Sequence, residues 1–207
     1  MSADMQTPST TDIVGMADMS DFMQQFADSR LLQNREMFIS EPITPTSAKK
    51  FISQLLSLEA EKAGERINLF VNSPGGDVNS GFAIFDTIRF IESPVNIITT
   101  GLCASIATII NIATPKERRL SMPNSRFLIH QPLIPGQVYG QASDIEITAR
   151  EILKTRERIN KLLAEETGSP LEKVEKDTVR DYWMNAGEAL EYGLINKIID
   201  SKKDLPK

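Results

Sequence analysis

The sequence predicts an α/β fold, because stretches typical of buried strands alternate along it with stretches of helical periodicity. Runs rich in branched and aromatic residues predict strands at residues 66–72, 95–100 and 126–129. Helices are expected at residues 47–63, 79–91, 104–113 and 143–167. The 207 residues are enough for one domain with a sizeable core and too few for two large ones.

The first of these helices places Phe51, Leu55 and Leu58 on one face, and Gly64 is expected to end it. A sharp loop at residues 73–76 follows the first strand, because Ser-Pro-Gly-Gly is a strong turn signal. The next helix is amphipathic. The one after it consists largely of small residues, which suits a buried helix.

The helix at residues 143–167 is unusually long. At a rise of about 1.5 Å per residue it extends about 36 Å. Ser143 and Glu146 fit a capping box, and Gly168 is expected to end the helix. Its apolar stripe is narrow and consists of Ile145, Ile152, Ile159 and Leu163. Two interpretations fit this pattern: packing against another subunit's helix, and an ordinary surface helix.

The composition excludes several classes of function. Lys and Arg number 23 against 28 Asp and Glu, a net charge of −5, so a nucleic-acid binder built on a basic surface is not expected. The single cysteine rules out an internal disulfide and a Cys-x-x-Cys metal site, and the single histidine rules out a multi-histidine metal centre. Any histidine-dependent catalysis must therefore use His130.

Residues 1–28 are expected to form a mobile leader ahead of one domain at 29–207. The leader is polar, acidic and rich in methionine, with a short weak helix near residues 19–26; the alternative is a segment ordered by a partner. It resembles neither a secretory signal nor a transit peptide, so a cytoplasmic protein is expected. The uncharged stretch between Glu92 and Lys116 could span a membrane by its length, but its polar residues favour a buried strand followed by a buried helix.

Ser105 stands where α/β folds build catalytic sites. It opens a helix directly after a buried strand, at the strand's carboxyl end. The helix start offers free backbone N–H groups and a positive dipole end, which suit a developing oxyanion. A serine nucleophile needs a base, and His130, which follows the strand at 126–129, is the one imidazole available. The alternatives are a serine that caps a buried helix and a structural histidine.

A carboxylate would have to orient the imidazole, and the 28 Asp and Glu residues leave the choice open. Asp177 and Asp181 are attractive because they flank the turn between two C-terminal helical segments, although either could cap a helix instead. Gly75 and Gly76 let the backbone approach a ligand and point N–H groups at it. The phosphate-loop pattern is absent from the sequence. Cys103 is expected to be a buried core residue rather than a nucleophile.

Four stretches of the sequence together resemble the proteolytic subunits of the Clp protease. They are FVNSPGGDVNSGFAIFDTIRFI (70–91), TTGLCASIATII (99–110), MPNSRFLIHQPL (122–133) and KDTVRDYWMNAGEALEYGLIN (176–196). The resemblance runs from about residue 29 to residue 200. It implies the ClpP/crotonase-like form of the α/β fold, with repeated β-β-α units. The helix at 143–167 then resembles the protruding handle that joins two rings.

The resemblance implies a serine endopeptidase in which Ser105 is the nucleophile, His130 the general base and Asp181 the orienting acid. The N–H groups of Gly76 and Ile106 would form the oxyanion hole. The family assembles as two stacked seven-membered rings, a tetradecamer with its sites inside a chamber. A partner AAA+ Clp-type unfoldase hydrolyses ATP and feeds in unfolded polypeptides for protein quality control. For this chain the expectations are homomeric or mixed rings and no cofactor, metal, nucleic acid or membrane.

Several positions depart from the family pattern. The acidic leader precedes the region where the family usually begins near its pore loop, and Ile106 replaces a methionine while keeping its backbone donor. The turn QPLIPGQVYGQA (131–142) is two residues longer than the usual QPLGGAQGQA. Asn68 and Phe70 stand where the family often has two aromatics that help receive the ATPase's docking loop. These differences bear on pore gating, ring contacts and ATPase docking.

Two other functions remain open at this point. One is a structural paralogue that completes a mixed ring and cuts little itself, although the presence of Ser105, His130 and Asp181 argues against it. The other is a crotonase-type acyl-CoA enzyme, which would use backbone oxyanion donors without a serine triad.

Overall fold

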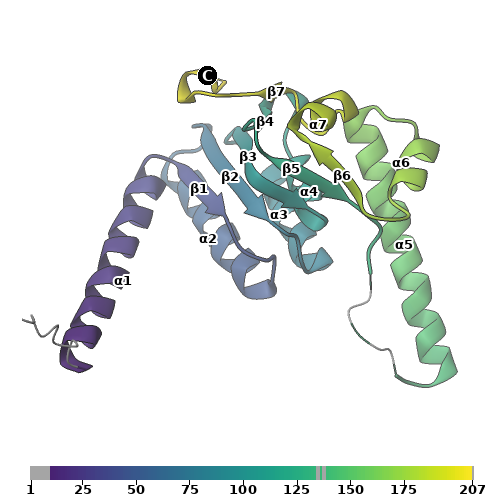
Figure 1. Cartoon of the computed structure of the whole chain (residues 1–207), viewed down its shortest axis with the longest axis horizontal. Helices are drawn as coiled ribbons and strands as arrows, with labels where there is room; N and C mark the ends of the chain where they lie inside the picture. The colour runs from purple at the N-terminus through teal and green to yellow at the C-terminus, as the bar shows by residue number, and fades with distance from the viewer. Residues whose placement is uncertain (1–9, 134–135, 137–138, 207) are drawn as a thin grey trace, which may run out of the picture.

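The structure is a computed structural model that describes residues 10–133, 136 and 139–206, with side chains for all of these except 10–18 and 20. Within this part of the chain the strands form one seven-stranded sheet (Figure 1). They are β1 (Glu36–Ile39), β2 (Ile67–Ser73), β3 (Val95–Ala104), β4 (Arg119–Ser121), β5 (Arg126–Ile129), β6 (Tyr182–Asn185) and β7 (Lys197–Ile198). The order is β1-β2-β3-β4-β7, with β5 also pairing with β3 and β6 pairing with β5. Only the β5–β6 pair is antiparallel.

Helices precede, connect and follow these strands. They are α1 (Thr10–Gln33), α2 (Pro45–Glu61), α3 (Val78–Phe90), α4 (Ile106–Asn111), α5 (Ala142–Thr167), α6 (Leu171–Asp177) and α7 (Ala186–Tyr192), with 3-10 turns at Lys116–Arg118 and Lys202–Asp204. The main core lies between one face of the sheet and α2, α3 and α4, and it also includes side chains of α5, α6 and α7. Alternate residues of β2, namely Ile67, Leu69 and Val71, are fully buried in it. This mixed architecture confirms the predicted α/β fold.

The ends of several predicted elements differ from expectation. The helix expected to stop at Gly64 ends earlier, at Glu61, with Lys62 as its C-cap. The strand expected to stop at Thr100 continues as β3 to Ala104, and α4 is correspondingly shorter than the predicted helix. The reason is pairing, because Leu102–Ala104 form a parallel ladder with Arg126–Leu128. The uncharged stretch thus forms β3 and α4, which are largely buried, as predicted. Among the described helices none combines the length and apolar character needed to cross a membrane.

The long helix is confirmed as α5, but its predicted start is wrong. Gln141 occupies the N-cap position without a side-chain capping bond, so Ser143 and Glu146 lie inside the helix and form no capping box. Gly168 ends α5 in the left-handed conformation, with a φ of 78°, as predicted. Residues 134–135 and 137–138 of the lengthened turn before α5 lie outside the described residues.

The leader holds more helix than the sequence predicts. The short helix expected near residues 19–26 lies inside α1, which continues past residue 29 to Gln33 without a break. Figure 1 shows α1 standing away from the sheet. Its side chains Met19, Phe22, Met23 and Phe26 are all more than half exposed. Contact with the body is made near its C-terminal end, where Leu32 packs against the core.

The two unusual positions on β2 lie on the sheet face opposite the main core. Phe70 stacks on Phe38 of β1, with ring centroids 4.9 Å apart. Asn68 is buried and accepts a hydrogen bond from Asn96 Nδ2 (3.0 Å). The aromatic pair on this face is therefore built across β1 and β2 rather than along β2.

Candidate active site

Strand β3 changes its neighbour at Gly101. Before it, Ile97–Thr99 pair with β4, and after it, Leu102–Ala104 pair with β5. Gly101 has a φ of 93°, and a Cβ there would lie 2.8 Å from Asn72 Oδ1, which accepts a hydrogen bond from the Leu102 N–H (3.0 Å). Glycine suits this bend because it tolerates positive φ without a side-chain clash. The bend brings the end of β3 against β5.

The parallel register between β3 and β5 places Ser105 beside the segment that carries His130. Ala104 pairs with Leu128, and the Ser105 N–H continues the ladder by donating to the Leu128 carbonyl (2.9 Å). His130 lies two residues beyond Leu128, directly after the end of β5. Both side chains therefore stand at the carboxyl edge of the sheet.

The antiparallel register between β5 and β6 brings in the carboxylate. Ile129 pairs with Tyr182, so the ladder extended by one residue sets His130 opposite Asp181. Asp181 comes from the turn that follows α6, about fifty residues further along the chain than His130. Strand pairing thus brings three distant segments together.

The three side chains make a continuous hydrogen-bonded relay. His130 Nε2 lies 2.8 Å from Ser105 Oγ, and His130 Nδ1 lies 3.0 Å from Asp181 Oδ1. In the Nδ1–H tautomer the imidazole donates to the carboxylate and accepts the Ser105 hydroxyl proton. The imidazole is 17% exposed and the carboxylate 62%. The structure therefore brings together the serine, histidine and aspartate named from the sequence.

Ser105 sits on a sharp turn between β3 and α4. Its φ of 56° and ψ of −127° are unusual for a residue with a side chain, and such backbone strain concentrates at functional sites. Although Ser105 occupies the N-cap position of α4, its side chain makes no capping hydrogen bond. The alternative of a simple helix cap is therefore wrong, and the hydroxyl turns to His130 instead.

The Gly75–Gly76 loop lies directly against this turn. A Cβ on Gly75 would lie 2.7 Å from Ser105 Cβ and 3.1 Å from the Ile106 nitrogen, so glycine leaves open the space beside that N–H. Ile43 holds the loop from the other side, where its N–H donates to the Gly75 carbonyl (2.8 Å). Among the described residues the Gly76 N–H has no acceptor, and the Ile106 N–H begins α4, where no preceding turn supplies one. Neither N–H group is therefore occupied by another acceptor within the described part of the chain.

A small hollow adjoins Ser105 and His130. Its lining consists of Val78, Ser105, Ile106, Thr108, Ile109, Ile129, His130, Pro132, Ile159 and Leu163. Most of these side chains are apolar, and two of them come from the buried stripe of α5. Apolar side chains therefore form most of the wall beside the hydroxyl.

Comparison with known proteins covers almost the whole chain. The family model described as Clp protease matches residues 21–202. The chain belongs to the Clp protease family. It is 51% identical over 178 residues to "ATP-dependent Clp protease proteolytic subunit 3" of Rhizobium johnstonii, an alignment that covers 86% of this chain and 90% of the relative. It is 50% identical to subunit 2 of Treponema denticola (86% and 88% covered) and 45% identical to subunit 1 of Chlamydia muridarum (88% and 95% covered).

In this Clp protease chain the other candidate carboxylate is engaged elsewhere. Asp177 ends α6, where it accepts hydrogen bonds from Lys173 Nζ (2.6 Å) and from the Tyr192 hydroxyl (3.1 Å). Asp181 lies beyond it and is followed by β6, so the turn joins a helix to a strand rather than two helical segments. The register with β5 is what distinguishes the two aspartates.

Cys103 is buried in the core, as predicted. Its side chain is inaccessible to solvent, and burial raises the pKa of its thiol to about 12. A thiol in that state carries almost no thiolate near neutral pH, so it is a poor nucleophile.

Sequence reasoning missed Gln131, which contacts the turn that carries Asp181. Its N–H donates to the Thr178 carbonyl (2.7 Å), and its side-chain Nε2 donates to the Val179 carbonyl (2.9 Å). The only signal for it in the sequence is its position directly after His130.

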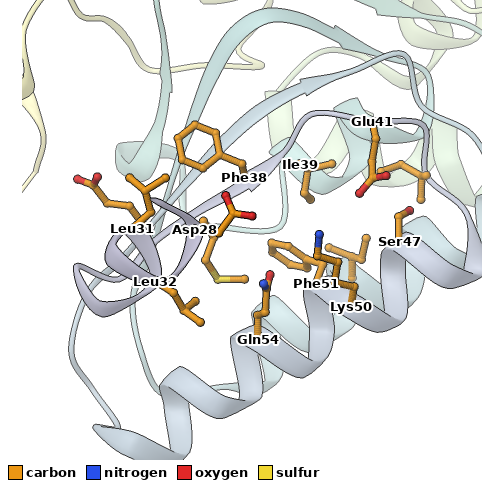
Figure 2. Close-up of a pocket in the computed structure, with 14 residues that line it drawn as sticks. Asp28, Leu31, Leu32, Phe38, Ile39, Glu41, Ser47, Lys50, Phe51 and Gln54 are labelled. Atoms are coloured by element: carbon orange, nitrogen blue, oxygen red, sulfur yellow. The ribbon is translucent and has the colours of Figure 1, made fainter. Parts of the chain in front are cut away.

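A second hollow lies apart from these residues, between the end of α1, β1 and α2. Figure 2 shows Asp28 of α1 and Lys50 and Gln54 of α2 around it, with Leu31 and Phe51 among its apolar lining. Neither the serine, the histidine nor the aspartate of the relay lines this hollow. It is therefore separate from the candidate active site.

Proposed function

We propose that this chain is an active serine endopeptidase subunit that cleaves peptide bonds of unfolded proteins through an acyl-enzyme. The observation that carries the proposal is the His130 imidazole held between Ser105 Oγ and the Asp181 carboxylate. This is the arrangement that a nucleophile, its base and an orienting acid require. A subunit that only completed a ring would need none of these contacts.

The proposed reaction begins when Ser105 Oγ attacks the carbonyl carbon of the scissile peptide bond. His130 Nε2 takes the hydroxyl proton, while Asp181 holds the Nδ1–H and stabilises the imidazolium. The N–H groups of Gly76 and Ile106 donate to the oxyanion of the tetrahedral intermediate. The C–N bond then breaks as His130 passes its proton to the leaving amine, which leaves an ester on Ser105. Water, deprotonated by His130, hydrolyses the ester and frees the hydroxyl.

The proposed particle is a tetradecamer of two stacked seven-membered rings, homomeric or mixed, in the cytoplasm. An AAA+ unfoldase would hydrolyse ATP and supply unfolded polypeptides, and this chain itself would use no cofactor. The names of the relatives support an ATP-dependent partnership. The projecting part of α5, with Ile145, Ile147 and Leu153 exposed, supports a contact between rings (Figure 1).

Labelling with a fluorophosphonate tests the catalytic role directly. The assembled protein, purified alone, is expected to gain one adduct per chain, mapped to Ser105 by mass spectrometry, and Ser105→Ala is expected to gain none. Failure of the wild-type particle to react would argue for the structural paralogue. Binding of coenzyme A without any peptidase activity would instead favour an acyl-CoA enzyme.

Two further measurements test the assembly. Native mass spectrometry of the chain, alone and with any sister subunit, is expected to reveal paired seven-membered rings. A folded reporter protein is expected to survive incubation with the particle when no ATPase is present. Rapid ATP-independent degradation of that folded reporter would contradict the proposal of a gated chamber.

A further inference from the structure

Little holds the Asp181 side chain in its position. It follows the turn between α6 and β6, is 62% exposed, and among the described residues its carboxylate hydrogen-bonds only to His130. An exposed carboxylate gains little from a single charged or polar partner, because water competes for it. Its place at His130 Nδ1 therefore depends on the backbone on either side of it, which is the turn before it and β6 after it.

Gln131 donates hydrogen bonds to two successive backbone carbonyls of the turn before Asp181. Its N–H donates to the Thr178 carbonyl (2.7 Å), and its side-chain Nε2 donates to the Val179 carbonyl (2.9 Å). Val179 is itself 53% exposed, so packing of its own side chain contributes little to its position. The side-chain amide of Gln131 thus holds the middle of the turn, two residues before Asp181.

The two ends of the turn are fixed by other contacts. At its start, the Thr178 hydroxyl lies 2.9 Å from the Val174 carbonyl of α6 and 3.1 Å from Asn160 Oδ1 of α5, and its proton is donated to one or the other. At its end, Tyr182 pairs with Ile129 in the sheet. Loss of the Gln131 side chain would therefore release the middle of the turn without releasing either end.

We propose that Gln131 is a positioning residue whose side-chain amide keeps the Asp181 carboxylate at His130 Nδ1. Gln131 adjoins His130, and Pro132 restricts its backbone to extended conformations. The segment that carries the imidazole therefore also sets the place of the carboxylate. Gln131 does not line the hollow beside Ser105, so it acts through Asp181. Only the kinetic test of this inference depends on the proposed function.

The kinetic test compares Gln131→Ala and Gln131→Glu with the control Val179→Ala. Glutamate keeps the side chain's length but lacks the N–H donor, whereas the control keeps the accepting carbonyl. Both Gln131 variants are expected to lower kcat about tenfold to a hundredfold with KM changed less than about threefold, since the amide positions the partner of the base and binds no substrate. The control is expected to stay within about twofold of wild type.

A double-mutant cycle separates positioning from a general structural role. If Gln131 acts only through Asp181, Gln131→Ala is expected to cause no further loss in an Asp181→Ala background. An equal loss in that background overturns the proposal. Wild-type kcat in both Gln131 variants, or a raised KM with kcat unchanged, also overturns it.

The second measurement is a nuclear magnetic resonance signal of His130, and it does not require peptidase activity. His130 is the only histidine of the sequence, so its Nδ1–H gives a single proton signal in protein labelled with nitrogen-15 at histidine. A carboxylate partner moves that signal downfield and slows its exchange with water. Both Gln131 variants are expected to shift it upfield or broaden it, whereas Val179→Ala retains it. An unchanged signal in both Gln131 variants refutes the positioning role. An unreactive Ser105 with the wild-type signal present would refute the proposed function alone.

Discussion

Gly75 and Ser105 approach so closely that a methyl group on Gly75 would lie 2.7 Å from Ser105 Cβ and 2.6 Å from the Ala104 carbonyl oxygen. Both residues also have positive φ, 88° at Gly75 and 56° at Ser105. Two unusual backbone conformations are therefore packed against each other at the end of β3. Their contact fixes the turn that aims the serine hydroxyl at His130.

Substitution of Gly75 by alanine is expected to disable the site. The added Cβ would lie 3.1 Å from the Ile106 nitrogen and would force the Ser105 turn to move. Peptide hydrolysis should fall by about a hundredfold or more, as for loss of an oxyanion donor. The matched control is Gly64→Ala, because Gly64 has a φ of 77° but a methyl group added there would meet no atom within 4 Å.

Both substitutions carry similar backbone strain, about 1–3 kcal/mol for a side chain at positive φ. Thermal unfolding and fluorogenic peptide cleavage should therefore separate the two variants. Gly64→Ala is expected to lose stability while keeping its rate of cleavage. Equal rates for Gly75→Ala and wild type would show that the close approach is irrelevant to catalysis.

Substitution of His130 by alanine is expected to abolish peptide cleavage and leave assembly intact. Removing the base of a serine triad lowers kcat by about 10⁶-fold. The backbone bond from the Ser105 N–H to the Leu128 carbonyl does not involve the imidazole, so the turn should persist. Peptide hydrolysis checks the first expectation, and native mass spectrometry checks the second. Near wild-type cleavage would refute the role assigned to His130.

Local sequence patterns placed Ser105 and His130 after strands, whereas only the family resemblance pointed to Asp181 as the carboxylate. Choosing between Asp177 and Asp181 requires the register of β6 against β5. β6 is four residues long, and only Met184 among them is buried, so its sequence lacks the alternation that marks a strand. In this case pairing with β5, rather than local pattern, makes the strand.

Other short strands were also not predicted from the sequence, because their local pattern is not that of a strand. β4 consists of Arg119, Leu120 and Ser121, all buried, and two of its three residues are polar. The buried strand is tolerated because the Arg119 guanidinium has a partner 47 residues along the chain, where it donates to the Glu166 carbonyl (2.8 Å) and to the Glu166 carboxylate. Long-range compensation of this kind leaves no trace in a local pattern.

Burial of Cys103 predicts slow alkylation of its thiol and a defined pH dependence of the free energy of unfolding. Since the pKa of its thiol is raised to about 12, the folded protein holds that proton more tightly than an unfolded chain, whose thiols titrate near about 8.5. The contribution of this group to stability is therefore complete below about pH 8.5 and is lost as the pH rises toward 12.

Iodoacetamide at mildly alkaline pH should modify Cys103 only after denaturant is added. Chemical unfolding should also show wild type losing stability relative to Cys103→Ala as the pH rises above about 8.5, the pKa of the thiol in the unfolded chain. Stoichiometric alkylation of the folded particle within minutes would contradict the burial of this side chain.

The ion cluster of Arg119, Glu166 and Arg89 predicts a large loss of stability for Glu166→Gln. Arg119 is 1% exposed, and burial lowers the pKa of its guanidinium while Glu166 opposes that effect. Both arginines donate to the Glu166 carboxylate, which links β4 and α3 to the end of α5. Removing one partner of a buried pair leaves an uncompensated charge and costs about 3–5 kcal/mol.

A matched control for that variant is Glu157→Gln, which breaks an exposed pair with Lys161 on the same helix. Exposed pairs of this kind contribute little to stability, because water and salt screen the two charges. Denaturant unfolding of the two variants under identical assembly conditions should therefore differ by several kilocalories per mole. Glu166 lies near the C-terminal end of α5, whereas the exposed side chains of Ile145 and Ile147 lie near its N-terminal end. The loss should therefore appear as a lower free energy of unfolding of the subunit rather than as a failure of contacts made by the N-terminal part of α5. Equal stabilities for the two variants would mean that Arg119 retains adequate partners in the carbonyl oxygens of Thr114 and Glu166 alone.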